Sequence, residues 1–376
     1  MVKKYNFVIV VLDGARLEFI KDLRNFKSLC EKGTFFSKMI TYGAQTVMSM
    51  HATFTGIYGN INGADNYFGS ALFRNKSCKT LAQYLKDDGY YTLGDTINEI
   101  VVPGQGFEEL RIHDEKKDDL TERHKEMIKE VVKLRDEDKN FFLYVHYSNI
   151  HTGMVKTVLK KYGDFEKDYF ANKEKNIENY KKYVGEADTY VGELLKTCEE
   201  VDLFKDTIFI VMSDHGSSVG DKIGEIGYGR YCYDYTMNAF SIFVGPEIFS
   251  VKEVNKVSRT VDILPTILDI LKLEEDKKHR KVNGKSLLPL IDNNEKRIAY
   301  SESAGLVDPY PTKDKPLLKC VRQGDWKLIY NVKTGEKELY NLTEDEKENE
   351  NIFEKNSEKT EEMFAEIVKL NPEMQK

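Results

Sequence analysis

The chain has 376 residues, of which 40% are hydrophobic and 32% are charged, a balance typical of a folded globular protein and not of a disordered one. Its 56 Lys and Arg residues against 63 Asp and Glu residues give a formal charge of −7, so no nucleic-acid-binding surface is evident. No apolar run approaches the roughly 18–20 residues of a membrane span. The five cysteines are scattered without a CxxC pair, which argues against a disulfide framework or a thiolate zinc site.

Four short apolar runs predict strands, in chain order Phe7–Leu12, Phe141–Val145, Thr207–Met212 and Phe240–Val244. Runs of this length that are rich in Val, Ile and Phe are typical of strands buried on both faces, as in parallel sheets. The first run follows two lysines but stops at Asp13 without a small-residue cleavage site. We therefore interpret it as a strand of a cytoplasmic protein and not as a signal peptide.

Segments with apolar residues at helical spacing lie between these runs. They predict helices at Lys79–Asp88, residues 115–138, Tyr180–Glu200 and Val261–Leu273. Strands that alternate with helices favour an α/β fold with a doubly wound, mostly parallel sheet flanked by helices. The stretches rich in Lys and Glu are most simply solvated helix faces and loops.

The composition changes near residue 292, where a charged linker, Asp292–Arg297, precedes shorter strand-like pieces. These pieces are Ile298–Ser301, Leu317–Arg322, Trp326–Tyr330 and Glu338–Leu342. Turn residues separate them, so we expect a small antiparallel sheet, followed by a terminal helix at Ser357–Leu370. We therefore divide the chain into a larger α/β domain, residues 1–292, and a small C-terminal α+β subdomain, residues 293–376, packed on it.

Polar residues follow two of the predicted strands. Asp13 comes directly after the first, and Asp214 and His215 follow the run Thr207–Met212. The carboxyl ends of buried parallel strands are where α/β folds bind ligands. Carboxylate and imidazole together suit zinc or manganese. A helix N-cap at Asp13 and a capped turn at Asp214 are the alternative interpretations.

Thr46 is a candidate nucleophile. It follows a Gly43-Ala44-Gln45 turn and precedes a helical pattern, so its hydroxyl is expected at a helix N-terminus. Free N–H groups and the helix dipole favour an anion at such a position. A metal that coordinates the hydroxyl oxygen would lower its pKa and make it nucleophilic. The alternative is an ordinary helix N-cap.

These features together resemble the alkaline phosphatase superfamily, in its sulfatase-like branch. The resemblance runs nearly end to end and in the same order along the chain. It is carried by Asp13, the helix motif Thr46, Ser49, Thr55 and Gly56, TLAQYLKDDGYYT (80–92), FFLYVHYSNIHTG (141–153), SDHG (213–216), Tyr233-Asp234 before FSIFVGP (240–246), and GDWKLIY (324–330).

The resemblance implies a ligand set and roles for further residues. One divalent metal ion, Zn or Mn, would be held by Asp13, Thr46, Asp214 and His215, with Thr46 as the nucleophile. His151 would assist the leaving group or stabilise the transferred anion. Substrate binding is assigned to Ser49, Asn149 and Arg230. A second ion is not expected, because the Asp-x3-His pair of two-zinc members is missing before His151.

The sequence departs from the sulfatase pattern at four places. Sulfatases form formylglycine from Cys or Ser in a Cys/Ser-x-Pro-Ser-Arg motif, whereas this chain has Thr46 and lacks the Pro and the Arg. Gly14 replaces a second aspartate, Asp95 lies in the element that corresponds to Gly-Lys-Trp-His, and His215 replaces the Asn of Ser-Asp-Asn-Gly. What remains is similar to threonine-nucleophile phosphoglycerol and phosphoethanolamine transferases and to some phosphodiesterases.

We therefore expect a metal-dependent hydrolase of phosphate esters, acting on a phosphodiester, a phosphomonoester or a phosphonate through a covalent phospho-threonine. The expected substrate is a small-molecule, lipid or sugar phosphate ester. Three alternatives stay open: a transferase of phosphoglycerol or phosphoethanolamine type, a sulfate-ester hydrolase without formylglycine, and a non-catalytic binding protein on a decayed scaffold.

The remaining histidines are not expected to take part in the chemistry. His51 lies on the nucleophile helix and is expected to pack, and His146 lies inside an apolar strand as a hydrogen-bonded core residue. His113, His124 and His279 lie in charged stretches and are expected at the surface.

Overall fold

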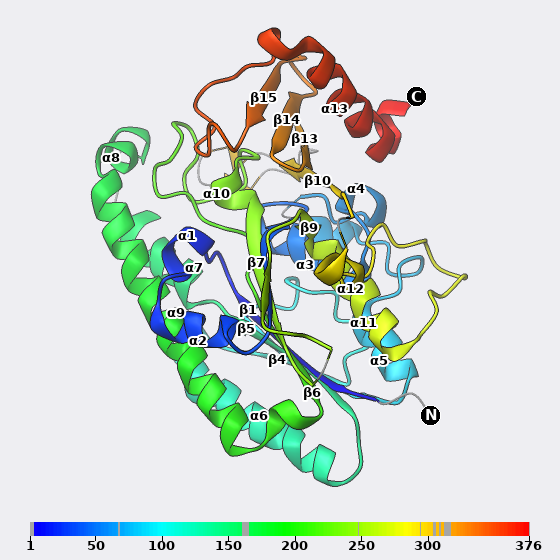
Figure 1. Cartoon of the computed structure of the whole chain (residues 1–376). Helices are drawn as coiled ribbons and strands as arrows, with labels where there is room; N and C mark the ends of the chain where they lie inside the picture. Colours follow the sequence, from blue (N-terminus) through cyan, green and yellow to red (C-terminus); the bar gives the residue numbers. More distant parts are fainter. Residues whose placement is uncertain are drawn as a thin grey trace.

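The computed structural model describes residues 4–66, 68–159, 165–246, 248–293, 295–303, 306–307, 310–311 and 317–375. A large central sheet has helices on both faces, and a smaller sheet with its own helix lies at one end (Figure 1). The predicted α/β fold with a small C-terminal antiparallel sheet is therefore confirmed.

The large sheet has nine strands in the order β4-β3-β5-β1-β6-β7-β2-β8, with β9 beside β2. The strands are β1 (Asn6–Leu12), β2 (Thr34–Ile40), β3 (Tyr91–Thr96), β4 (Glu109–Ile112), β5 (Phe141–Tyr147), β6 (Thr207–Met212), β7 (Asn238–Val244), β8 (Lys252–Val254) and β9 (Ser258–Arg259). The block from β4 to β6 is parallel throughout, which brings the carboxyl ends of β3, β5, β1 and β6 to one edge.

The prediction of a parallel strand at Phe240–Val244 is wrong in direction. β7 is antiparallel to both β6 and β2. A parallel neighbour would need a crossover helix between β6 and β7. The connection instead contains only the four-residue helix α10 (Asp234–Met237), so the chain returns antiparallel beside β6. β7 is nevertheless apolar at every buried position except Ser241, which is why its sequence resembles that of a parallel strand.

Alternate residues of the central strands pack on opposite faces of the sheet. Val8, Val10 and Leu12 of β1 face the core under α1, α2, α6 and α9, whereas Phe7 and Ile9 face the core under α3, α5 and α11. The helices are α1 (Leu17–Ile20), α2 (Arg24–Cys30), α3 (Thr46–Thr55), α4 (Gly59–Asn62), α5 (Leu81–Asp87), α6 (Leu120–Asp136), α7 (Asn149–Met154), α8 (Phe165–Ala171), α9 (Lys173–Glu200), α11 (Ile263–Leu271), α12 (Leu288–Asp292) and α13 (Ser357–Leu370).

Two long helices begin elsewhere than predicted, and capping explains one of them. α6 begins at Leu120 and not at residue 115, because the Asp119 side chain accepts the N–H groups of Thr121 and Glu122. α9 begins at Lys173, seven residues before the predicted start. α13 has the predicted bounds.

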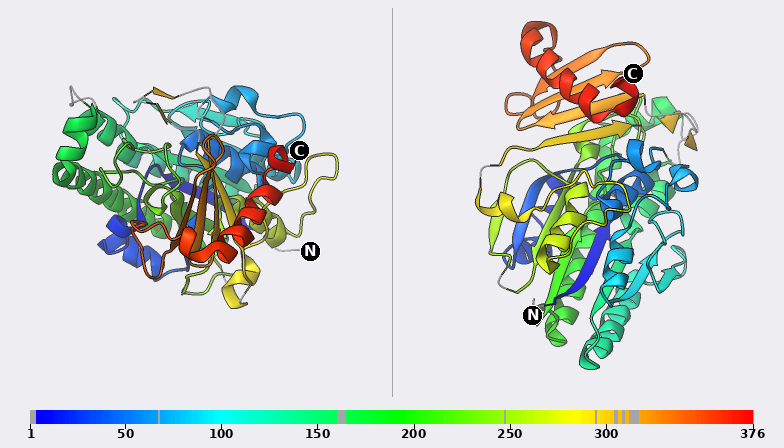
Figure 2. Two further views of the ribbon diagram at one scale, coloured as in Figure 1. Left: turned by 90° about the horizontal axis from the view of Figure 1, so that it is seen from above. Right: turned by 90° about the vertical axis from the view of Figure 1, so that its right-hand side faces the viewer.

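The C-terminal sheet lies beyond the carboxyl-end edge of the large sheet (Figure 2). Its strands are β10 (Ile298–Ser303), β13 (Leu318–Gln323), β14 (Trp326–Asn331) and β15 (Lys337–Asn341), and a separate pair is formed by β11 (Leu306–Val307) and β12 (Tyr310–Pro311). One apolar cluster joins Tyr42, Met48 and Tyr58 of the large unit to Tyr300 and Met363 of the small one. The small sheet therefore packs directly behind α3.

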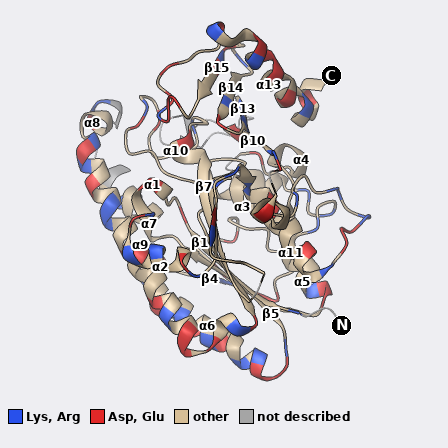
Figure 3. Cartoon of the chain, viewed as in Figure 1, with Lys and Arg blue, Asp and Glu red and all other residues tan. Residues whose placement is uncertain are grey.

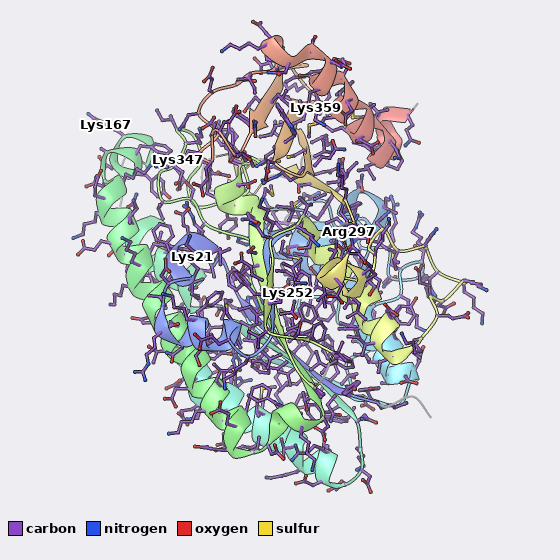
Figure 4. All side chains as sticks on the ribbon, viewed as in Figure 1. Lys21, Lys167, Lys252, Arg297, Lys347 and Lys359 are labelled. Carbon is purple, nitrogen blue, oxygen red and sulfur yellow. The ribbon has the colours of Figure 1, made fainter. Side chains whose placement is uncertain are left out.

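Acidic and basic residues are interspersed along α6, α9 and α13 (Figure 3). The basic side chains labelled in Figure 4 come from separate elements and do not form one patch. Within the described ranges, no helix combines the length and the apolar character that a membrane crossing requires.

Candidate active site

The site forms where three neighbouring elements end or begin. Asp13 directly follows β1, and Asp214 and His215 follow the adjacent parallel strand β6, with Val11 paired to Met212. Thr46 is the first residue of α3, and the preceding residue, Gln45, has extended backbone. The helix N-terminus therefore faces the sheet edge that carries the two carboxylates.

A tight turn after β1 lets the backbone approach Asp214. Gly14 has φ +72°, and its N–H donates to Asp214 Oδ1 at 3.0 Å. A Cβ at this position would lie 2.7 Å from Ser217 Oγ. A side chain at residue 14 would therefore displace Ser217. This contact is consistent with Gly14, and not a second carboxylate, following Asp13.

His215 presents one ring nitrogen to the centre of the site. Its Nδ1 lies 2.8 Å from the Gly216 carbonyl, so we assign the proton to Nδ1. The lone pair of Nε2 is then surrounded by oxygens: Thr46 Oγ1 at 3.2 Å, Asp214 Oδ2 at 3.3 Å and Asp13 Oδ1 at 3.7 Å. These oxygen and nitrogen lone pairs converge on one buried point, an arrangement that a positive charge between them would stabilise.

Each carboxylate is fixed through one oxygen and open at the other. Asp13 Oδ2 lies 3.1 Å from His146 Nε2, and Asp214 Oδ1 accepts two backbone N–H groups. Asp13 Oδ1 and Asp214 Oδ2 are buried and have no hydrogen-bond partner. This pattern fits a divalent metal ion with nitrogen and oxygen ligands, because the donors orient the carboxylates and leave one oxygen of each for the ion.

The two carboxyl groups differ in their electrostatic surroundings. Burial alone would raise the pKa of Asp13, but the facing His151 and His146 rings outweigh it and hold this pKa well below its usual range. Burial raises the pKa of Asp214, although the neighbouring His215 opposes this, and the negative charge of Asp13 raises it further. A cation between them would remove this repulsion.

His146 takes part in the site although the sequence indicated only a core residue. It is fully buried on β5, as expected, and its Nδ1 lies 3.3 Å from Thr96 Oγ1. Its other nitrogen orients Asp13. The strand register explains this contact, since His146 is paired with Val11, two residues before Asp13.

His151 and Tyr228 form the opposite wall. His151 lies on α7, its side chain is 23% exposed, and its Nδ1 is 3.9 Å from Asp13 Oδ1 and 3.2 Å from the Tyr228 hydroxyl. The Tyr228 ring also packs against His215 at 4.7 Å between centroids. Sequence patterns did not indicate Tyr228, because it lies in an irregular loop after β6.

A cavity of about 340 Å³ opens onto these groups. Its described lining consists of Asp13, Gln45, Thr46, Val47, Ile97, Asn98, Ile100, Val101, Glu115, His151 and Tyr228. The cavity therefore joins Asp13 and Thr46 to a second, more apolar region formed by the loop after β3. Its volume is at the lower end of the range for small-molecule sites.

The sulfatase family model matches residues 5–273, which is well over half of the chain. The chain belongs to the sulfatase family. A second model, the C-terminal part of N-sulphoglucosamine sulphohydrolase, matches residues 224–375. Sulfatase-family enzymes bind a divalent metal ion, and Asp13, Asp214 and His215 form a group that can hold one.

Known members of the sulfatase family match shorter segments. Arylsulfatase K of Homo sapiens is 33% identical over 123 residues, which cover 32% of this chain and 22% of that protein. The choline-sulfatase of Rhizobium meliloti (strain 1021) is 24% identical over 147 residues, covering 38% of this chain and 26% of the relative. The matched segments thus span less than a third of each relative.

Solved structures match over nearly the whole chain. One, in complex with its substrate D-glucosamine-2-N,6-O-disulfate, has a TM-score of 0.78 at 19% identity and covers 99% of both chains. The phosphonate monoester hydrolase of Agrobacterium radiobacter has a TM-score of 0.76 at 14% identity and covers 99% of this chain and 96% of that one. These likenesses show a shared fold.

Three residues assigned to substrate binding from the sulfatase-like resemblance do not line the cavity. Ser49 is buried, and its hydroxyl donates to the Asp214 carbonyl at 2.8 Å. Arg230 donates to the Gly224 carbonyl, and Asn149 is half-buried at the start of α7. A substrate-binding role for them stays a prediction. His51 is buried and bonded to the Val47 carbonyl within α3.

A second buried group lies where the sulfatase Gly-Lys-Trp-His element is replaced. Asp95 Oδ2 lies 2.8 Å from His113 Nδ1 and 3.0 Å from His124 Nε2, and Asp95 Oδ1 accepts from Arg123 at 2.7 Å. The prediction that both histidines lie at the surface is wrong, because they are 2% and 0% exposed. His124 falls four residues after Leu120, on the apolar face of α6.

This second group is closed and not suited to a metal ion. The remaining ring nitrogens contact Ser148 Oγ at 3.1 Å and the Tyr190 hydroxyl at 2.7 Å. Burial alone would raise the pKa of Asp95, but hydrogen bonds from His113, His124 and Arg123 hold this pKa well below its usual range. The carboxylate charge is thus already compensated by Arg123, and an added cation would face a guanidinium.

Proposed function

We propose that this sulfatase-family chain is a metal-dependent hydrolase of phosphate-type esters, with Thr46 as the nucleophile. The observation that carries the proposal is the position of Thr46 Oγ1. It lies at the N-terminus of α3, faces the cavity, and is 3.2 Å from the unprotonated nitrogen of His215, beside two carboxylate oxygens without donors.

The residue at the nucleophile position favours phosphorus over sulfur as the reacting centre. A threonine cannot become formylglycine, on which sulfatases depend, so the covalent intermediate must be cleaved by attack at its central atom. Phosphoryl transfer needs mainly positioning and charge neutralisation. Because no Lys or Arg is among the described lining residues, a singly charged diester or phosphonate monoester suits the cavity at least as well as a dianionic monoester.

The chain supplies the reacting groups. The Thr46 hydroxyl gives up its proton to solvent, and its Oγ1 forms a new P–O bond. The bond from phosphorus to the leaving alcohol breaks, and His151 gives its proton to the departing oxygen. Tyr228 fixes the His151 ring through Nδ1, which leaves Nε2 to carry that proton. Water then cleaves the phospho-threonine with His151 as the base.

Asp13, Thr46, Asp214 and His215 would hold the ion. A divalent ion there supplies the positive charge that lowers the pKa of the Thr46 hydroxyl and offsets the charge of the ester. His146 keeps Asp13 oriented through Oδ2, and the Gly14 and His215 N–H groups do the same for Asp214 Oδ1.

Sulfate-ester hydrolysis is the second candidate. It is supported by the family match over residues 5–273 and by relatives that are arylsulfatases and a choline-sulfatase. A transferase would share every step up to the phospho-threonine and would differ only in accepting an alcohol in place of water.

A panel of nitrophenyl esters tests the proposal. We expect bis-nitrophenyl phosphate and a nitrophenyl phosphonate to be hydrolysed at least as fast as nitrophenyl phosphate, and all of them faster than nitrophenyl sulfate, with Zn²⁺ or Mn²⁺ added. Thr46→Ala should keep the fold and lose at least ~10³-fold in rate, as expected when a covalent route is removed.

Thr189→Ala is the matched control, because Thr189 is exposed on α9 and only bonds within its helix. It should leave the rate unchanged. Faster turnover of nitrophenyl sulfate than of bis-nitrophenyl phosphate would favour the second candidate. Near-normal turnover by Thr46→Ala would exclude covalent catalysis by this residue.

A further inference from the structure

The cavity carries a carboxylate that the proposed chemistry does not use. Glu115 lies in the turn between β4 and α6, lines the cavity and is half-buried. Its Oε2 accepts the Thr152 hydroxyl at 2.7 Å, and Thr152 follows His151 on α7. Glu115 is thus fixed beside the wall that carries the proposed general acid.

No basic side chain in the described part of the chain pairs with Glu115. The neighbouring Lys117 instead pairs with Asp114 at 3.1 Å. A carboxylate in a ligand cavity without a cationic partner favours a positively charged ligand group and disfavours an anionic one.

The other residues of this region are mostly apolar. Ile97, Ile100 and Val101 form the wall after β3, and Asn98 supplies the one amide there. A sugar ring would need several polar partners, whereas three aliphatic side chains and one carboxylate match a short alkyl chain that ends in an ammonium group.

The size of the cavity also favours a short leaving group. About 340 Å³ must hold both the transferred group, at Thr46 and Asp13, and the leaving alcohol. This volume suits a small ester and not a long oligosaccharide.

We infer that Glu115 selects esters whose leaving alcohol carries a cationic alkylammonium group. This inference rests on the proposed hydrolase function, since it assigns the part of the cavity at Glu115 to the leaving group. The anionic end of such a substrate lies at the ion-binding groups, and its cationic end lies at Glu115.

Two isosteric esters isolate the charge: the 2-(trimethylammonio)ethyl ester and the 3,3-dimethylbutyl ester of the phosphate or sulfate that the protein hydrolyses. We expect kcat/KM to favour the cationic ester by about tenfold or more, the scale of one partly screened charge pair. Glu115→Gln, which can still accept from Thr152, should bring the ratio close to one by slowing only the cationic ester.

Glu126→Gln on the exposed face of α6 is the control and should leave the ratio unchanged. A wild-type ratio near one, or equal losses on both esters in Glu115→Gln, would overturn the inference. If neither ester is cleaved, calorimetric binding of both esters to Thr46→Ala, with and without Glu115→Gln, still tests the charge preference directly. Failure of the proposed function would instead show as no turnover of the nitrophenyl esters. A hydroxyl-binding role for Glu115 would show as equal binding of both esters.

Discussion

Two buried groups of Asp and His side chains lie at the same edge of the sheet, and they differ in what they leave unpaired. Around Asp13, Asp214 and His215, two carboxylate oxygens have no donor and one imidazole nitrogen carries a lone pair. Around Asp95, both oxygens accept hydrogen bonds, and both histidines are bonded at each nitrogen. Similar residue types thus form an open site in one place and a closed network in the other.

The difference lies in the neighbours and not in the ligand types. Arg123 compensates the charge of Asp95, whereas no described Lys or Arg side chain reaches Asp13 or Asp214 within salt-bridge distance. The first group also faces a cavity, and Asp95 is not among the described residues that line this cavity. Residue types alone therefore do not identify a metal site. A metal site also needs ligand atoms without hydrogen-bond donors and access from a cavity.

Asp214→Asn should have the largest effect. We expect loss of bound metal and of activity together, because one of the two open carboxylate oxygens is replaced. In metal-free protein the same change should raise the free energy of unfolding by about 1–3 kcal/mol, since it removes a buried, unpaired charge that faces Asp13. Elemental analysis and denaturant unfolding after chelation measure the two effects.

A full-occupancy ion in Asp214→Asn would show that the site is placed wrongly. A lower stability of the metal-free variant would show that Asp214 Oδ2 has a partner, and the contrast between the two groups would then be lost.

Asp95→Asn should lower the free energy of unfolding, in contrast to Asp214→Asn in the metal-free protein. It removes the buried carboxylate that accepts from Arg123 and leaves Arg123 with only the more distant Asp118, so we expect a loss of about 3 kcal/mol in the free energy of unfolding. Bound metal per folded chain should stay at the wild-type value, because Asp95 is outside the open site. Urea unfolding and elemental analysis of the folded fraction test both statements.

Asp118→Asn provides the matched control. Asp118 faces the same Arg123 at 3.6 Å but is 33% exposed, so its loss should cost about 1 kcal/mol or less. Release of metal from Asp95→Asn would mean that the second group holds an ion after all.

Strand-end residues were predictable because the sequence places them directly after apolar runs. Asp13, Asp214 and His215 meet as expected, since β1 and β6 are adjacent and parallel. Thr46 was predictable from the turn before a helical pattern. The strand at Phe240–Val244 was given the wrong direction, because burial on both faces makes an antiparallel strand look like a parallel one.

Residues contributed by loops and second elements were not predictable in the same way. Tyr228 and Glu115 lie in connections whose path the sequence does not specify. His124 shows the opposite failure: its surroundings in sequence are charged, but it occupies the apolar stripe of α6 together with Ile128 and Val131. Helical position, and not local charge, was the relevant signal.

Glu225 is a third case for this comparison. It is a buried carboxyl that accepts hydrogen bonds, and no cation among the described residues pairs with it. Its Oε1 accepts the N–H groups of Arg230 and Tyr231, and burial raises its pKa from 4.5 to about 7. A carboxyl whose pKa is raised on folding stabilises the fold fully below its unfolded pKa and loses this contribution as pH rises to the folded pKa. The expected loss between about pH 4.5 and pH 7 is about 3 kcal/mol relative to Glu225→Gln.

Urea unfolding of metal-free wild type and Glu225→Gln at several pH values between 4.5 and 8 measures this difference directly, because the other titrating groups are common to both proteins. Glu122→Gln, at an exposed position of α6, is the control variant. If the Glu225→Gln difference does not change with pH, the backbone donors compensate the charge as fully as Arg123 does at Asp95. In that case an unpaired oxygen, and not the lack of a cation, would be the feature that sets Asp13 and Asp214 apart.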